Sequence, residues 1–129
     1  GALYNWYTLE NPDLCPTGWH VPTDKEWMTM TTYLGNEKNS GGKLKETGIT
    51  HWSSPNTDAT NETGFTALPG GNRDDLGGFN YAGFSGYWWT SSQVGGTFAW
   101  PRFMNYNNGS VDKFPNNKKK GFSVRCVRD

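Results

Sequence analysis

The stretch CPTGWHVPTDKEW, from Cys15 to Trp27, decides how the fold begins, because a turn-rich segment passes directly into a helix. Its two prolines and its glycine interrupt regular structure. Thr23 and Glu26 then have the spacing of a capping box, in which each side chain accepts a hydrogen bond from the other residue's backbone amide. Apolar residues follow at helical spacing as far as Leu34, and Gly35 is a typical helix stop. We therefore predict a helix over residues 23–34.

The rest of the chain predicts one more helix and then short strands. Residues 40–48 read as a short helix with Leu44 facing inward and Lys43, Lys45 and Glu46 facing outward. The first ten residues fit a strand or a short irregular lead-in. Beyond His51, glycine, asparagine and aromatic residues dominate, and the short apolar runs predict strands at 65–68, 87–91, 98–106 and 122–127. Helices followed by short strands and long loops indicate an α+β domain.

Length and aromatic content predict one domain with a core built from rings. A chain of 129 residues has a common single-domain size, so we expect one domain over 1–129. The mean hydropathy of −0.80 is low, but seven Trp, six Tyr and seven Phe exclude a disordered chain. We assign six rings to the core: Trp6, Trp19, Trp27, Phe65, Trp89 and Phe122.

The charge balance argues against nucleic acid as a partner. Lys plus Arg and Asp plus Glu both number 12, so the net charge is zero, whereas nucleic-acid binding needs a basic face. The one basic run, Lys118–Lys120, is expected to be a solvated loop. No apolar stretch is long enough to span a membrane.

The only two cysteines, Cys15 and Cys126, lie near opposite ends of the chain. A disulfide between them is the interpretation we favour, and two buried free thiols are the alternative. A disulfide would place the domain in an oxidising compartment, secreted or at the cell surface. We expect a monomeric module of a larger secreted protein.

Few residues suggest catalysis or a metal site. His20 lies in a rigid turn and is expected to be structural, whereas His51 is more open. Asp74 and Asp75 are adjacent, which suits loop capping better than paired acid–base chemistry. We expect no enzyme activity and no cofactor. Structural calcium stays open as an alternative, with oxygen ligands from Asn72, Asp74 and Asp75 or from Asn56, Asp58 and Asn61.

Four segments, in this order, resemble the Fibrobacter succinogenes major paralogous domain family: Cys15 to Trp27, GFTALPGG (64–71), WTSS (89–92) and GFSVRCVRD (121–129). The resemblance covers essentially the whole chain. That family is in turn similar to formylglycine-generating enzymes and to bacterial C-type-lectin-like domains. It implies a C-type-lectin-like α+β fold, with two helices on small antiparallel sheets, long Gly- and Asn-rich loops and termini close together. The catalytic cysteine pair of the formylglycine-generating enzymes is not expected here, because both cysteines are assigned to the bridge.

Rings in loop contexts are the best candidates for a binding surface. They are Phe79, Tyr81, Trp88, Trp100, Tyr106 and Phe114. Strand alternation suggests that Trp88 points outward if Trp89 points inward. In lectin-like relatives the segment before the last strand faces the ligand. This resemblance places the binding site on Trp88, Trp100, Arg102, Tyr106, Asn107 and Phe114.

These features predict a non-catalytic extracellular binding module. Sugar rings stack on aromatic side chains while amides bind their hydroxyls, so we expect a polysaccharide or oligosaccharide ligand. The module would serve adhesion or the targeting of a linked enzyme. The alternative is an adhesin or receptor domain that binds a protein with the same face.

Overall fold

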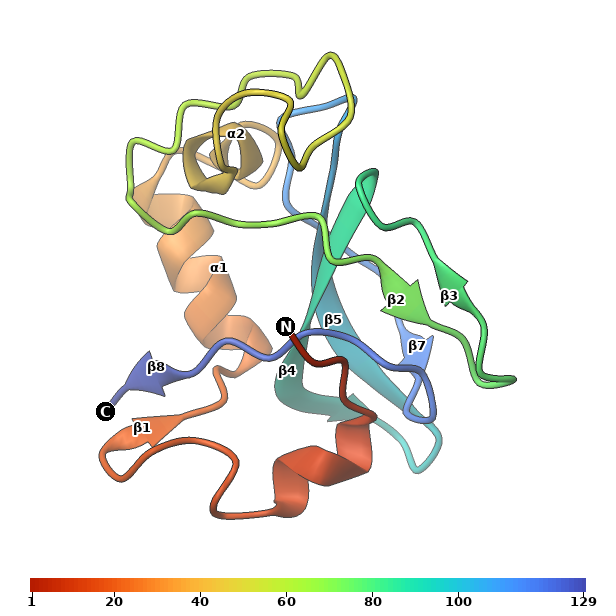
Figure 1. The fold of residues 1–129 in the computed structure, drawn as a ribbon. Coiled ribbons are helices and arrows are strands. Elements are labelled where there is room, and N and C mark those ends of the chain that lie inside the picture. The colour runs from red at the N-terminus through yellow and green to blue at the C-terminus, as the bar shows by residue number, and fades with distance from the viewer.

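A long antiparallel hairpin forms the centre of the fold in the computed structural model, which describes all 129 residues (Figure 1). Strand β4 (Ser85–Val94) pairs with β5 (Phe98–Asn105). Aromatic residues favour extended backbone in both strands, and Gly95 adopts the positive φ that their tight connection requires. Strands β6 (Asp112–Lys113) and β7 (Asn116–Asn117) both pair with β5, which completes a four-stranded sheet.

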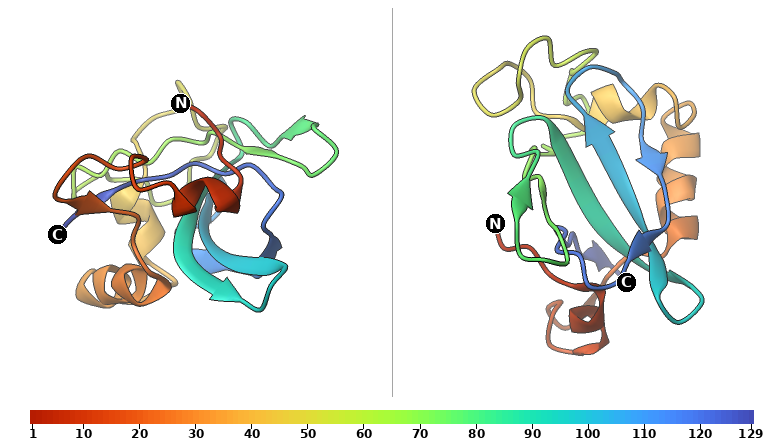
Figure 2. Two further views of the ribbon diagram at one scale, coloured as in Figure 1. Left: turned by 90° about the horizontal axis from the view of Figure 1, so that it is seen from below. Right: turned by 90° about the vertical axis from the view of Figure 1, so that its right-hand side faces the viewer.

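Smaller elements surround this sheet (Figure 2). They are the 3-10 helix η1 (Trp6–Glu10), helices α1 (Asp24–Tyr33) and α2 (Ser40–Leu44), and strands β1 (Trp19–His20), β2 (Asn72–Arg73), β3 (Phe79–Asn80) and β8 (Val127–Arg128). β1 pairs with β8, and β2 pairs with β3, each in a two-stranded antiparallel sheet. The α+β class with two helices and small antiparallel sheets is therefore confirmed. None of the helices has the length and apolar character needed to cross a bilayer.

Helix α1 begins as predicted, whereas α2 is shorter than predicted. The Thr23 hydroxyl accepts from the Glu26 amide at 3.1 Å, and the Glu26 carboxylate accepts from the Thr23 amide at 3.0 Å. α2 ends at Leu44 because the backbone of Lys45 is already extended, with ψ 141°. Lys45 was expected on the outside, but its side chain is fully buried.

Both faces of the β4–β5 hairpin are covered, which corrects the prediction that Trp88 points outward. Trp88 lies in a cluster with Trp27 of α1, and Trp89 lies in a second cluster with Phe122. Strand alternation does place the two indoles on opposite faces. The error was to assume that one of those faces meets solvent, when each meets its own core.

The predicted core rings are mostly confirmed. Trp6, Trp27, Trp89 and Phe122 are buried and Phe65 is partly buried, but Trp19 is 45% exposed. Trp19 lies in the two-stranded sheet β1–β8, outside both core clusters.

Two of the four predicted strands are regular, and two are not. Residues 87–91 fall within β4, and residues 98–106 match β5. Residues 65–68 make a single bridge, between Ala67 and Lys45. Phe122 and Ser123 bridge to Tyr4 and Trp88, and only the end of the predicted 122–127 strand forms β8.

The first and last segments of the chain lie side by side and are covalently joined. Tyr4 bridges to Phe122, and Cys15 forms a disulfide with Cys126 across 111 residues. The predicted disulfide is thus confirmed, and an oxidising compartment is consistent with it.

Removal of this cross-link should strongly destabilise the domain. In the chain-entropy description, a disulfide that closes a loop of 111 residues stabilises by about 4–5 kcal/mol. We expect the double variant Cys15→Ala/Cys126→Ala to lose about that much free energy of unfolding in chemical denaturation. A loss below about 1 kcal/mol would show that the disulfide does not restrict the unfolded chain as proposed.

Candidate functional site

The structure buries two of the six predicted ligand-binding residues. Trp88 is 5% exposed and Arg102 is 0% exposed. The Trp88 ring packs against Trp27 and Phe65, with centroid distances of 6.3 Å to each. Neither side chain is available to a ligand at the surface, so both assignments are corrected to core roles.

Arg102 instead joins the sheet to helix α1. Its Nε donates to Asp24 Oδ1 at 2.7 Å, and its Nη1 donates to Glu37 Oε1 at 2.8 Å. Lys113 Nζ donates to the second oxygen of Asp24 at 2.9 Å. Burial alone would raise the pKa of Asp24, but the hydrogen bonds from Arg102 and Lys113 outweigh it and hold that pKa below its ordinary value.

Trp100, on β5 with Arg102, and Phe114, directly after β6, lie outside the hollow that Tyr106 and Asn107 line. Trp100 is half-buried under the ammonium group of Lys113, which lies 4.9 Å from the ring centroid. Phe114 is 68% exposed, in the connection between β6 and β7. Neither ring lines a hollow of the surface described below.

The remaining two predicted residues, Tyr106 and Asn107, share a hollow of about 640 Å³. We call it the aromatic–amide hollow, and seven residues line it: Tyr81, Phe84, Ser85, Asn105, Tyr106, Asn107 and Asn108. The Phe84 and Tyr106 rings meet edge to face at 5.3 Å. No charged side chain is among the lining residues.

Two amide groups of the hollow keep free hydrogen-bond donors. Ser85 Oγ donates to Asn105 Oδ1 at 2.6 Å, which fixes the orientation of the Asn105 side chain. Asn108 Oδ1 accepts from both the amide and the hydroxyl of Ser110. The NH₂ groups of Asn105 and Asn107 have no acceptor within the protein and are free to donate to a ligand.

A buried lysine holds the loop that carries these amides. Lys45 Nζ donates to the carbonyls of Thr57, Asn105 and Asn108 at 2.8, 3.0 and 2.9 Å. Burial lowers the pKa of Lys45 to about 8, so the amine still carries its charge at neutral pH. Three N–H groups thus meet three carbonyls, and the loop is fixed before any ligand arrives.

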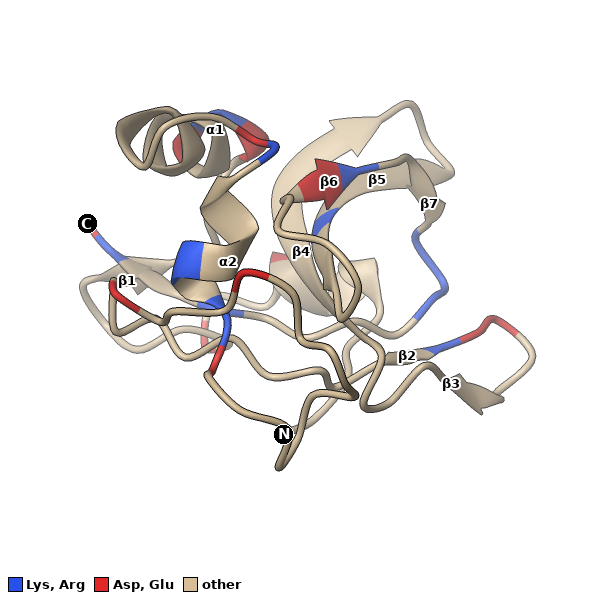
Figure 3. Cartoon of the chain, turned by 90° about the horizontal axis from the view of Figure 1, so that it is seen from above, with Lys and Arg blue, Asp and Glu red and all other residues tan.

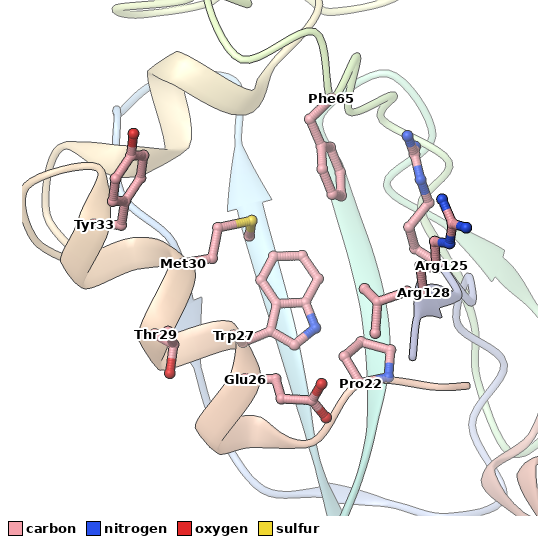
Figure 4. A pocket seen from close by; sticks show the side chains of 10 residues that line it. Pro22, Glu26, Trp27, Thr29, Met30, Tyr33, Phe65, Arg125 and Arg128 are labelled. Atoms are coloured by element: carbon pink, nitrogen blue, oxygen red, sulfur yellow. The ribbon is translucent and has the colours of Figure 1, made fainter. Parts of the chain in front are cut away.

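Figure 4 shows a second concave surface, between α1 and the C-terminal strand. We call it the α1 groove; it has a volume of about 450 Å³. Ten residues line it: Pro22, Glu26, Trp27, Thr29, Met30, Tyr33, Phe65, Arg125, Val127 and Arg128. Its floor is apolar, and its two arginines lie on the strand side.

His20 contacts the groove residue Glu26 and has the structural role predicted for it. Its Nδ1 lies 2.6 Å from an Asp129 oxygen, and its Nε2 lies 2.8 Å from a Glu26 oxygen. The hydrogen bonds to Asp129 and then Glu26 raise the pKa of His20. His51, the more open imidazole, pairs with Glu46 at 2.7 Å and lines neither hollow.

Among the six residues named for calcium, Asp74 and Asn56 form hydrogen bonds within the protein. Asp74 caps its loop, accepting from the amides of Leu76 and Gly78 at 3.0 and 2.8 Å, as loop capping predicted. The Asn56 amide donates to the carbonyls of Glu46 and Gly48. No group of three or more His, Cys, Asp or Glu side chains is arranged to hold a metal ion.

The basic run is also not a solvated loop throughout. Lys and Arg are spread over the chain and adjoin one another only at Lys118–Lys120, after β7 (Figure 3). Lys118 is 3% exposed, lies 4.4 Å from the Trp6 ring centroid and donates to Gln93 Oε1 at 2.7 Å. The Lys118 ammonium group therefore makes contacts within the folded domain and is not solvated.

These features define a disulfide-closed α+β domain with two surface hollows, one aromatic and uncharged, the other apolar with a cationic rim. The chain belongs to the Fibrobacter succinogenes major domain family, whose model matches residues 1–128. The family membership inferred from the four sequence segments is confirmed. No curated protein and no solved structure matches the chain.

Sequence reasoning found part of the aromatic–amide hollow and missed the rest. Tyr106 and Asn107 were predicted, whereas Phe84, Ser85 and Asn108 were not. The NYNN run at residues 105–108 was a usable signal, because amides that follow a strand commonly line its end. The contribution of Phe84 required knowledge of the β4–β5 register, which pairs Ser85 with Asn105.

Asp24→Asn should destabilise the domain by about 3 kcal/mol, because it leaves the buried Arg102 with one carboxylate partner fewer. The pKa of Asp24 is lower in the folded than in the unfolded chain. The ionised Asp24 carboxylate therefore stabilises the fold fully at pH values above its pKa in the unfolded chain. This stabilisation is lost as the pH falls through its lower pKa in the folded chain. Denaturation at several acidic pH values should show a weaker pH dependence for Asp24→Asn than for wild type, and Asp75→Asn is the exposed control. Equal effects of both variants would contradict the buried-network account.

Lys45→Met should destabilise the domain by about 3 kcal/mol, because three buried carbonyls lose their donor. The matched control is Lys43→Met, two residues earlier in α2, which removes one hydrogen bond, to the Leu34 carbonyl. We expect the control to lose about 1 kcal/mol. Similar losses for the two variants in chemical denaturation would contradict the anchoring role of Lys45.

Proposed function

We propose that this domain is a non-catalytic extracellular binding module that recognises carbohydrate at the aromatic–amide hollow. The observation that carries the proposal is the hollow itself, in which three aromatic rings and three asparagines line one concave surface without a charged side chain. Aromatic rings offer apolar faces to the C–H groups of a sugar, and amides offer directional hydrogen bonds to its hydroxyls.

The rigidity of the hollow supports a binding role. Tyr106 is held from both sides, since its amide donates to Phe84 O and its carbonyl accepts from the Thr57 amide, both at 2.9 Å. The hydrogen bonds from Lys45 to the Asn105 and Asn108 carbonyls hold the turn that contains Tyr106. A preformed site loses little conformational entropy on binding, which favours a weakly interacting polar ligand such as a sugar.

The lining chemistry and the disulfide support the non-catalytic and extracellular parts of the proposal. The lining residues comprise phenols, one phenyl ring, amides and one serine, which supply contacts but no imidazole or carboxylate for proton transfer. The disulfide suits a secreted or surface location. A C-type-lectin-like fold, with adhesion or targeting of a linked enzyme as its task, fits the same reading.

One observation favours a protein partner as the second candidate. The β2–β3 hairpin exposes Leu76 at 94% and Phe79 at 73%, next to the exposed Tyr81. Exposed apolar side chains gathered on one hairpin are typical of a surface that contacts another protein.

Retention on insoluble cellulose, xylan and mannan tests the carbohydrate proposal. We expect retention on at least one of them, with Phe84→Ala or Asn107→Ala weakening binding about tenfold, which corresponds to about 1.4 kcal/mol. Phe114→Ala is the matched control, because it removes an exposed ring outside the hollow. Absence of retention on a broad glycan panel, or an equal loss in the control, would refute the proposal. Leu76→Glu/Phe79→Glu should leave carbohydrate binding unchanged.

A further inference from the structure

The α1 groove is separate from the aromatic–amide hollow, and the two share no lining residue. Its floor is formed by the indole of Trp27 and the ring of Phe65, which meet at 5.9 Å with an interplanar angle of 60°. Met30 closes the floor on the helix side (Figure 4). A volume of about 450 Å³ lies within the range of pockets that enclose small molecules.

The strand side of the groove carries two positive charges without counter-ions. The Arg125 guanidinium stacks on Phe65, with its Cζ 4.3 Å from the ring centroid. Neither Arg125 nor Arg128 takes part in any of the ion pairs of the structure. Both are exposed and can turn toward an anion in the groove. Guanidinium groups bind carboxylates through paired hydrogen bonds.

The one carboxylate in the groove does not neutralise these arginines. Glu26 accepts from the Thr23 amide and lies within hydrogen-bond distance of His20. Figure 4 shows its carboxylate beside Pro22, toward the other end of the groove from the Arg125 and Arg128 side chains. The negative charge of Glu26 is therefore already paired within the protein, whereas the positive charges of Arg125 and Arg128 are not.

A buried donor in the groove also lacks a partner. The indoles of Trp6, Trp52 and Trp89 each donate to a backbone carbonyl, at 2.9, 2.9 and 2.8 Å. Trp27 is 3% exposed, yet its Nε1 has no acceptor. Figure 4 shows this nitrogen on the edge of the ring that faces the strand side of the groove. A buried N–H without an acceptor is costly, and a ligand oxygen placed there would remove that cost.

We propose that the α1 groove is a binding site for a small organic anion with a flat apolar body and a carboxylate. The body lies on Trp27, Phe65 and Met30. The carboxylate accepts from Arg125 and Arg128, and binding brings one oxygen to the Trp27 N–H. The site is independent of the carbohydrate proposal, because its ligand class, its residues and its charge all differ.

Two probes of nearly equal shape test the proposal: 2-naphthoate, which is anionic, and 2-naphthamide, which is neutral. We expect naphthoate to bind at least about tenfold more tightly in NMR titrations. The Trp27 indole proton should move downfield with naphthoate, because it gains an acceptor. Arg125→Gln/Arg128→Gln should abolish the preference for the anion. Both arginines are exposed, so this variant should retain the fold.

The matched control is Arg73→Gln, since Arg73 also stacks on an exposed ring, Phe79, with its Cζ 5.3 Å from the centroid. This control should keep the preference for naphthoate. Equal affinity for the two probes, an unmoved Trp27 indole proton, or equal effects of the two sets of substitutions would overturn the proposal. Binding of an acetylated Glu-Phe-Asp-Phe peptide without binding of naphthoate would assign the groove to a protein segment and would also overturn it. Retention on polysaccharides is unaffected by any of these outcomes.

Discussion

The burial of Trp88 and Trp89 on opposite faces of one hairpin is the constraint on which the rest of the structure depends. Each indole requires its own covering layer, and a chain of 129 residues must supply both. Helix α1 and the loops around Trp52 cover one face, while η1 and the Phe122 segment cover the other. The second layer needs both ends of the chain at the same place, which explains why the disulfide joins Cys15 to Cys126.

Buried charges connect the long loops to this hairpin where apolar contacts are few. Lys45 binds three carbonyls beneath the 105–108 turn, and Arg102 joins β5 to Asp24 and Glu37. Each charge is expensive to bury and is offset by its hydrogen bonds, which use all three Lys45 donors but leave Arg102 Nη2 without a partner. These hydrogen bonds give each loop a defined position, and they fix Asn107 and Asn108, which lie beyond the end of β5.

The parts of the fold that rest on local chemistry could be predicted from the sequence, and the parts that rest on distant contacts could not. The capping box at Thr23 involves residues three apart, and the structure contains both of its hydrogen bonds. The family resemblance rested on contiguous segments and was confirmed as well. The positions of Trp88, Lys45 and Arg102 depend on partners tens of residues away. A lysine or arginine in an irregular sequence resembles a solvated residue until those partners are known.

Prediction of the candidate site from the sequence was incomplete for the same reason, because some of its residues are brought together only by distant contacts. Tyr106 and Asn107 were predicted from the resemblance to lectin-like domains, but their neighbours Phe84 and Ser85 come from the other side of the hairpin. Composition gives only the number of aromatic residues, whereas the structure divides them into three groups. Some rings fill the two cores, some line a hollow with amides, and some, such as Phe114, are isolated and exposed. Only the second group combines stacking surfaces with free hydrogen-bond donors, and the proposed function rests on that group.

The most direct measurement is an NMR titration of the side-chain amide groups with soluble oligosaccharides of cellulose, xylan and mannan. The account predicts that one of these series moves the NH₂ resonances of Asn105 and Asn107 together and saturably, and leaves the Trp27 indole resonance in place. Saturable shifts confined to residues outside the hollow, or no shift with any of the three series, would contradict it.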